Sequence, residues 1–382
     1  MLIATIMKKA LLILTLALAM ANAFVVPNRQ PSPVLVNRLS QNSDLGRHDD
    51  RTSTTTSLPA TYVASNGPTV PSGLTTKISS VQLKSYIYDG YNLTYLCKPA
   101  SPKYRNAPPI LLIHPVGIGM SSWFWKRLME EDGPAMYGVD LIGCGLAHGA
   151  DAWDPNERGM SAPLAWVKAC EALMQRQVLG KAFPSLPFTS SSQYTVVAQG
   201  GLAPVGLLLT ARNLDKIRHL VLTSPPTDLT TAVAEKELAR NYEFFSSRIT
   251  APFAFGLLET RAAVKFFSNL FLFDKPCDDT WLDEAGNETC QAARPPVQVF
   301  NAGFCQARSY EPELEALANS ASTRVLVLQG EADTPRIKDR TEYYTKELAD
   351  KCEIVTLPGK NVLPWESPKE TNRAVRDFLG LP

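Results

Sequence analysis

From Ser79 onward, apolar runs that suit buried strands alternate with stretches of helical periodicity, and this alternation constrains the fold more than any other feature. The run PPILLIH (108–114) is continuously apolar, as expected for a strand that is covered on both faces. The other strand candidates are SVQLKSYIY, YNLTYLC, AMYGVDL, YTVVAQ, IRHLVLTS, TRVLVLQG and CEIVTLP, with helical patterns at 163–179, 202–213, 337–350 and 367–379. This order predicts an α/β fold with a doubly wound, mostly parallel sheet of the eight-stranded type.

Two local signals refine this architecture. The dipeptide Asp89-Gly90 separates the first two strand candidates and predicts a tight hairpin. The stretch from about 226 to 320 carries helical patterns such as ETRAAVKFFSNLFLF (259–273) and no clear strand. It predicts a helical cap inserted between the sixth and seventh main strands. The cap aromatics are expected either to line a binding cavity or to form the cap's own core.

The first 76 residues have the composition of a targeting region. Residues 1–23 combine Lys8 and Lys9, a short apolar run and a small-residue cleavage site at Ala21-Asn22-Ala23, which predicts a signal peptide. Residues 24–76 are rich in Ser and Thr and are expected to be a disordered, transit-like segment. The sequence ANAFVVP resembles the bipartite presequence of algae with complex plastids. We therefore expect plastid location, with secretion as the alternative, and a folded domain over 77–382.

Composition argues against several functional classes. The net charge is +1 and no basic stretch is interleaved with aromatics, so a nucleic-acid partner is not expected. The seven cysteines include no CxxC pair, so neither a zinc site nor a dense disulfide framework is expected, and Cys277 with Cys290 is the one pair to check. No motif indicates a metal or a nucleotide cofactor. The apolar run before Ala23 is too short to span a bilayer comfortably, so the mature protein is expected to have no transmembrane segment.

Five segments in order resemble the α/β-hydrolase fold superfamily, of the AB hydrolase-1 type, over residues 79–382. They are LLIHPVGIGMSSWFWKRL, YGVDLIGCGLAHG, RHLVLTSPP, VLVLQGEADTP and LPGKNVLPWESPKETNRAVRDFL. The resemblance implies a nucleophile at the sharp turn after the YTVVAQ strand, an acid after a later strand and a histidine near the C-terminus.

Two of the three triad positions implied by the resemblance hold residues that cannot react as the triad requires. The nucleophile position falls on Gly200, or on Gly201 if the register slides by one residue. The acid position matches Asp333, which alternatively caps the following helix. The histidine position falls on Asn361, with 362–364 as the neighbouring possibilities, and asparagine cannot shuttle a proton near neutral pH.

The resemblance also places an oxyanion-type loop after the PPILLIH strand. His114 matches the histidine that usually braces this loop, and Pro115 removes one backbone donor, which leaves the N–H of Val116. The second donor expected there is the N–H of Gly201. We therefore take His114, Val116, Gly200 and Gly201 as candidate ligand-binding residues.

These observations predict a plastid protein of this fold with a degenerate Ser-His-Asp triad, which binds an apolar or amphipathic small molecule under its cap. One alternative is an active hydrolase or lyase that acts on a lipid, pigment or small ester through non-standard residues, with His114 or His148 as general base. Another is a scaffold whose cap binds a protein partner. The sequence leaves open whether the chain is an enzyme.

Overall fold

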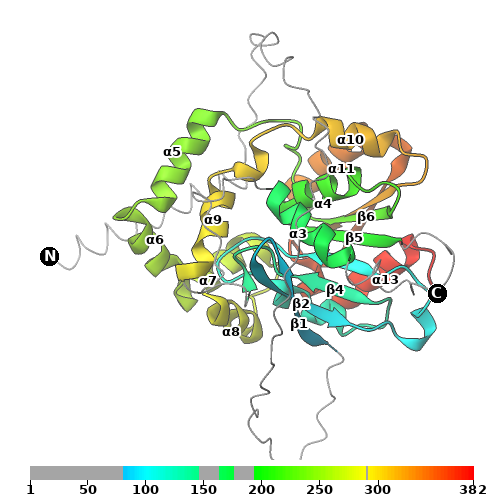
Figure 1. Cartoon of the computed structure of the whole chain (residues 1–382), viewed down its shortest axis with the longest axis horizontal. Helices are drawn as coiled ribbons and strands as arrows, with labels where there is room; N and C mark the ends of the chain where they lie inside the picture. Colours follow the sequence, from blue (N-terminus) through cyan, green and yellow to red (C-terminus); the bar gives the residue numbers. More distant parts are fainter. Residues whose placement is uncertain (1–80, 146–162, 176–192, 290) are drawn as a thin grey trace, which may run out of the picture. The chain divides into compact units, whose positions relative to one another are not determined.

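The computed structural model describes residues 81–145, 163–175, 193–289 and 291–382. Its centre is an eight-stranded sheet with the order β1-β2-β4-β3-β5-β6-β7-β8 (Figure 1). Strand β2 runs antiparallel to β1 and to β4, and all other neighbours are parallel. The strands are β1 (Gln82–Tyr88), β2 (Tyr91–Lys98), β3 (Ile110–Ile113), β4 (Met136–Val139), β5 (Tyr194–Gln199), β6 (Ile217–Thr223), β7 (Arg324–Gly330) and β8 (Cys352–Leu357). The predicted doubly wound, mostly parallel sheet is confirmed.

The hairpin between β1 and β2 closes as its dipeptide predicts. Asp89 has a φ of 48° and Gly90 a φ of 79°. Two successive residues with positive φ are the requirement of a type I′ turn, which matches the right-handed twist of the flanking strands.

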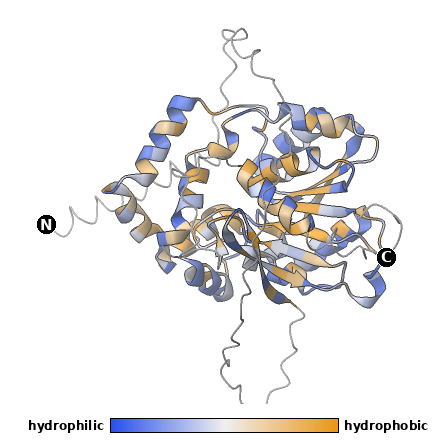
Figure 2. Cartoon of the chain, in the orientation of Figure 1, coloured by the Kyte–Doolittle hydropathy of each residue, from blue (hydrophilic) through white to orange (hydrophobic). Residues whose placement is uncertain are grey.

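Alternate residues of the central strands face two separate cores. Leu111, Val196 and Leu220 belong to one cluster of buried side chains, whereas Leu112, Val197 and Val221 belong to the other. Helices cover both faces because each face of such a strand is apolar. Figure 2 shows hydrophobic residues gathered along the strands.

The two faces are covered by different helices. The first core receives side chains from α3 (Leu164–Met174), α4 (Ala203–Ala211), α10 (Glu311–Ala318) and α11 (Thr334–Leu348). The second receives side chains from η2 (Ser122–Trp125), α2 (Lys126–Met129), α12 (Leu363–Glu366) and α13 (Pro368–Phe378).

The segment between β6 and β7 forms the helical insertion. It contains α5 (Glu235–Ser246), α6 (Thr250–Leu258), α7 (Arg261–Phe267), η6 (Ser268–Leu272), α8 (Asp279–Glu288) and α9 (Arg294–Asn301), which lie together beside the sheet layer (Figure 1). The helix expected over 259–273 is divided into α7 and the π-helical η6. Helix α10, which falls within the expected 226–320 cap, packs instead against α4 and α11 of the sheet layer. Among the described residues, no helix is both long and apolar enough to cross a membrane.

Candidate functional site

The turn after β5 has the backbone geometry of an elbow that presents a side chain. Strand β5 ends at Gln199, and Gly200 opens a 3-10 turn (η5, Gly200–Leu202) that leads directly into α4. Gly200 has a φ of +57°, in the left-handed region that favours glycine. A Cβ added at Gly200 would meet nothing within 4 Å. The elbow therefore keeps room for a small side chain at the position where the chain has none.

The neighbouring glycine is covered by the cap. A Cβ added at Gly201 would lie 2.4 Å from the Cζ atom of Phe300, which belongs to α9. Glycine at 201 therefore allows the aromatic ring to approach the backbone of the elbow. The N–H groups of Gly201 and Val116 donate no hydrogen bond to any other described residue. Both remain available as donors, although Val116 is itself 7% exposed.

Asn361 lies beside the elbow, as the family resemblance implies. The side-chain amide of Gln199 donates to the Asn361 carbonyl at 2.9 Å and approaches its Oδ1 at 3.4 Å. The Gln199 Oε1 accepts from the hydroxyl of Thr223 at 2.5 Å. The Asn361 N–H donates to the carbonyl of Leu272 at the end of η6. Asn361 thus links the elbow to the insertion, and its amide cannot take up a proton near neutral pH.

The carboxylate of Asp333 forms an ion pair with the buried guanidinium of Arg340. The carboxylate is 3.1 Å from the Nη2 atom of Arg340, and these side chains are 8% and 2% exposed respectively. Arg340 also donates from Nε to the carbonyl of Pro225 at 2.8 Å. Burial lowers the pKa of Arg340, while the charge of Asp333 opposes this effect. Asp333 stands at the N-cap position of α11, but its side chain makes no capping hydrogen bond. The alternative of a helix-capping carboxylate is therefore wrong, because the carboxylate is committed to Arg340.

His114 braces the loop after β3. It is fully buried, its Nε2 accepts from the N–H of Leu141 at 3.2 Å, and its Nδ1 lies 2.7 Å from the Pro115 carbonyl. An accepting Nε2 requires the proton to be on Nδ1, which donates to Pro115, so these contacts assign the neutral tautomer. Burial lowers the pKa of His114 to about 4. With both ring nitrogens bound to backbone, His114 has no nitrogen left to contact a ligand or to act as a base.

The space between the loop after β3 and the insertion is narrow. Ile118 and Gly119 of the loop face Phe255, Arg294 and Val297 of the insertion across a cleft of about 10 Å³. A cleft of that volume accommodates about one water molecule. It does not hold an organic ligand in this conformation.

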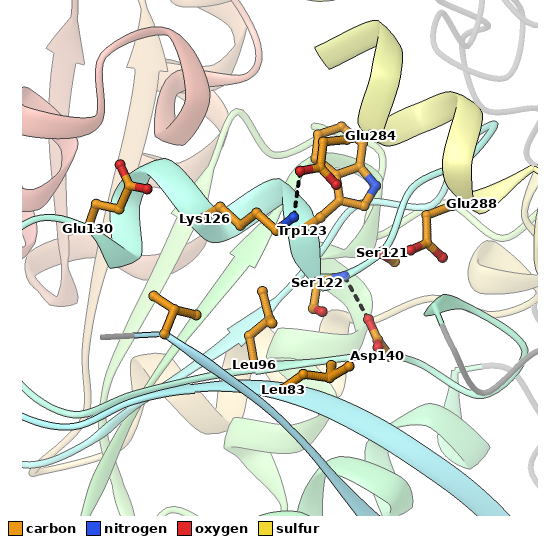
Figure 3. A pocket seen from close by; sticks show the side chains of 11 residues that line it. Leu83, Leu96, Ser121, Ser122, Trp123, Lys126, Glu130, Asp140, Glu284 and Glu288 are labelled. Atoms are coloured by element: carbon orange, nitrogen blue, oxygen red, sulfur yellow. Dashed lines mark hydrogen bonds and ion pairs between the residues drawn. The ribbon is translucent and has the colours of Figure 1, made fainter. Parts of the chain in front are cut away.

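A much larger cavity, of about 330 Å³, lies between α8, η2 and the β1–β2 hairpin (Figure 3). Its polar wall includes Asp140, Glu284 and Glu288, none of which the sequence predicted as site residues. The available signal was the spacing of Glu284 and Glu288, because residues four apart share one face of a helix. None of Gly200, Asp333 and Asn361 lines this cavity.

Among the described residues, neither Cys144 nor Cys277 carries an activated thiol. Cys144 is buried, and burial together with the charges of Asp140 and Glu288 raises the pKa of its thiol well above the usual value. Cys277 carries a free, buried thiol, while its candidate partner Cys290 lies outside the described residues, as does His148. No three His, Cys, Asp or Glu side chains among the described residues are grouped so that they could hold a metal ion.

No family model and no curated protein sequence matches the chain. In structure it is similar to the haloalkane dehalogenase DatA from Agrobacterium tumefaciens, with 16% identity, a TM-score of 0.54 and coverage of 79% of this chain and 97% of that one. A thermophilic esterase from Thermogutta terrifontis has 16% identity, a TM-score of 0.52 and coverage of 78% and 98%. The epoxide hydrolase CorEH has 15% identity, a TM-score of 0.53 and coverage of 78% and 99%.

These likenesses and the sheet order agree with the resemblance found in the sequence. The chain has the α/β-hydrolase fold.

Proposed function

We propose that this chain is a non-hydrolytic protein of the α/β-hydrolase fold, with a degenerate Ser-His-Asp triad, that binds a small apolar or amphipathic molecule. The observation that carries the proposal is the geometry of Gly200. The elbow retains the left-handed backbone and the open space that a nucleophile needs, yet it carries no hydroxyl or thiol. Without a nucleophile there is no covalent acyl intermediate.

The other two triad positions support the same proposal. Asn361 cannot remove a proton from a nucleophile, and the carboxylate of Asp333 is held by Arg340. In a well-studied serine protease, loss of the nucleophile or the base lowers turnover by a factor on the order of 10⁶. Loss of both therefore leaves at most the weak catalysis that backbone donors and binding can provide.

Covalent labelling tests the absence of a nucleophile. The full chain is treated with a serine-directed fluorophosphonate and analysed by intact mass, and we expect no adduct. A Gly200→Ser variant fits the open space and is also expected to stay unlabelled, because no general base stands at 361. Adding Asn361→His should give the first detectable adduct. An adduct on the unmodified protein would refute the proposal.

The alternative of an active enzyme that uses His114 is less well supported. A general base works best when its pKa lies near the working pH, whereas the pKa of His114 is about 4 and its ring is fully buried. Turnover of acyl esters that His114→Ala abolishes in a folded protein would favour this alternative.

A second candidate role, binding of a protein partner through the cap, is favoured by exposed apolar side chains. Ile249, Phe253 and Phe266 are 85%, 59% and 53% exposed, and α6 carries no charged residue. Exposed apolar groups that cluster often mark interaction surfaces. Size-exclusion chromatography with light scattering of Phe253→Ser, compared with the unmodified chain, tests whether this face drives association.

We also propose that the protein is delivered to the plastid by the signal peptide at 1–23 and the transit-like segment at 24–76, with secretion as the alternative. The support is the sequence pattern around Phe24. A fluorescent protein fused to residues 1–76 and expressed in an alga with complex plastids should enter the plastid. A Phe24→Ala fusion should be retained outside it.

A further inference from the structure

Two Asn-x-Thr triplets in the chain have no part in the proposed function. They are Asn92-Leu93-Thr94 in β2 and Asn287-Glu288-Thr289 at the end of α8. Such a triplet, with any residue except proline in the middle, is the acceptor of N-linked glycans in chains that enter the secretory route. Because so short a pattern also arises by chance, the surroundings of each asparagine decide whether a glycan fits.

Both asparagine side chains are open to solvent and free of contacts. Asn92 and Asn287 are exposed, and the side-chain amide of neither forms a hydrogen bond with a described residue. A Cβ added to Gly286, next to Asn287, would meet nothing within 4 Å, so the surface beside this site is open. By contrast, Asn301 and Asn372, which lie outside such triplets, are 8% and 4% exposed. A glycan at 92 or 287 therefore displaces no contact of the folded domain.

The surroundings of Asn92 give an independent reason for a glycan at that site. Asn92 lies directly opposite Ile87 in the β1–β2 hairpin. Directly opposed residues of an antiparallel pair share one face, with Cβ atoms about 4.5–5.5 Å apart. Ile87 is 60% exposed, whereas Tyr86 and Tyr91 on the other face of the hairpin are 5% and 7% exposed. One face of the hairpin tip is thus packed into the core, and the other leaves an isoleucine open beside Asn92.

The exposed apolar surface continues along β1. Leu83 lies four residues before Ile87, on the same face of the strand, and is 51% exposed. Among the described residues outside the helical insertion, Leu83 and Ile87 are the only exposed large hydrophobic side chains. Four residues of strand span about 13 Å, a distance that a chain of a few sugar rings attached at Asn92 can cover. A bulky, solubilising glycan at Asn92 would therefore shield this apolar strip from other chains.

We propose that Asn92 and Asn287 carry N-linked glycans that are attached as the chain enters the endoplasmic reticulum. The inference rests on the signal peptide proposed for residues 1–23. Delivery to the plastid and secretion both begin with that signal, so the inference holds on either route.

The donor is an oligosaccharide linked through pyrophosphate to a lipid of the reticulum membrane. The amide nitrogen of the asparagine bonds to the anomeric carbon of the first sugar, and the amide releases one proton. The bond from that carbon to the pyrophosphate breaks, and the lipid pyrophosphate leaves. Transfer takes place on the entering chain, before Thr94 is buried and its hydroxyl donates to Asp140.

Translation of the full chain with microsomes derived from the endoplasmic reticulum tests the proposal. Protection of the product from added protease reports entry into the microsomes, independently of any glycan. We expect the protected chain to migrate more slowly in a denaturing gel, and an endoglycosidase that hydrolyses the bond between asparagine and sugar should reverse this shift. That hydrolysis converts the asparagine to aspartate, so peptide mass spectrometry should find the conversion at positions 92 and 287.

Substitutions assign each glycan to its site. Asn92→Gln and Asn287→Gln should each remove one of two mobility steps, and the double variant should remove both. Thr289→Ala should remove the same step as Asn287→Gln, whereas Thr289→Ser should keep it, because serine also completes the triplet. Asn106→Gln is the matched control and should keep both steps, since Asn106 is exposed but lies outside such a triplet. Transfer precedes folding, so a variant that folds poorly still gives a result.

The outcomes separate this inference from the proposals on which it depends. A chain that is protected from protease but does not shift would overturn glycosylation and leave the signal peptide in place. A chain that is not protected would overturn both. A glycan confined to one asparagine would overturn the assignment of the other. None of these results affects the fluorophosphonate experiment, which tests the non-hydrolytic role.

Discussion

The pair of Asp333 and Arg340 provides a quantitative test of whether Asp333 serves the stability of the fold. In the Asp333→Ala variant, Arg340 stays buried and keeps, among the described residues, only the Pro225 carbonyl as a hydrogen-bond acceptor. Removal of one partner from a buried ion pair typically costs about 3–5 kcal/mol, because it leaves an uncompensated charge. We therefore expect the free energy of unfolding to fall by about 3–5 kcal/mol, a large part of the total for an ordinary domain.

The second half of the test is a double-mutant cycle. Arg340→Met alone should be similarly costly, because it strands the Asp333 carboxylate at 8% exposure. The double variant Asp333→Ala/Arg340→Met removes both charges and should lose no more stability than the worse single variant. Lys338→Ala is the control on the same helix. It breaks an exposed pair with Glu342 and should cost less than about 0.5 kcal/mol.

The measurement is urea unfolding at 25 °C and pH 7.5, followed by far-UV circular dichroism. The reasoning fails if Asp333→Ala costs less than about 1 kcal/mol, or if the two single losses simply add in the double variant. Either result would show that Asp333 does not stabilise the fold, and Asp333 would again be a candidate for a reactive site.

The remaining predictions concern the elbow and the acidic cavity. Gly200→Ser should destabilise the fold by only about 1–2 kcal/mol in urea unfolding, since the space is open and only the left-handed backbone resists the side chain. Gly201→Ala should cost about 1–3 kcal/mol, and combination with Phe300→Leu should recover part of it, because the added Cβ meets the ring. The folded-state pKa of Glu288 is raised from 4.5 to about 7. Its favourable contribution to the free energy of unfolding is therefore present below pH 4.5 and is lost as the pH rises through 7. Gln resembles the neutral carboxyl, so at pH 8 the Glu288→Gln variant should need more urea to unfold than the unmodified chain. The gain in the free energy of unfolding should be on the order of 1–2 kcal/mol after allowance for partial exposure, and at pH 4 the two proteins should not differ. Identical pH profiles of stability would show that Glu288 is solvated.

Part of the candidate site was accessible from the sequence, through the local pattern at the elbow and through the family resemblance elsewhere. The pattern before Gly200 ends a buried strand and the pattern after it begins a helix, so a tight glycine turn between them was predicted and found. The place of Asn361 next to that turn was implied by the family resemblance of the C-terminal segment. The bracing role of His114 was also implied by the family resemblance of the segment around it.

Other features of the site depend on contacts between residues far apart in sequence. Phe300 lies 99 positions from the glycine whose backbone it approaches, and nothing in the pattern of α9 indicates that contact. Asp333 was weighed as a catalytic acid or a helix cap, and neither interpretation included its true partner two turns along α11. The acidic cavity requires α8 to be placed against the β1–β2 hairpin.

The sequence by itself determined the strand–helix alternation, the sheet class and the absence of a hydroxyl or thiol at the elbow. These are set by hydrophobic periodicity and residue identity, which act over a few residues. Only the tertiary structure decided which charged group holds Asp333, which ring covers Gly201, and where a cavity remains. Those outcomes depend on how whole helices pack against the sheet, and close packing allows each side chain only the neighbours that the complete fold provides.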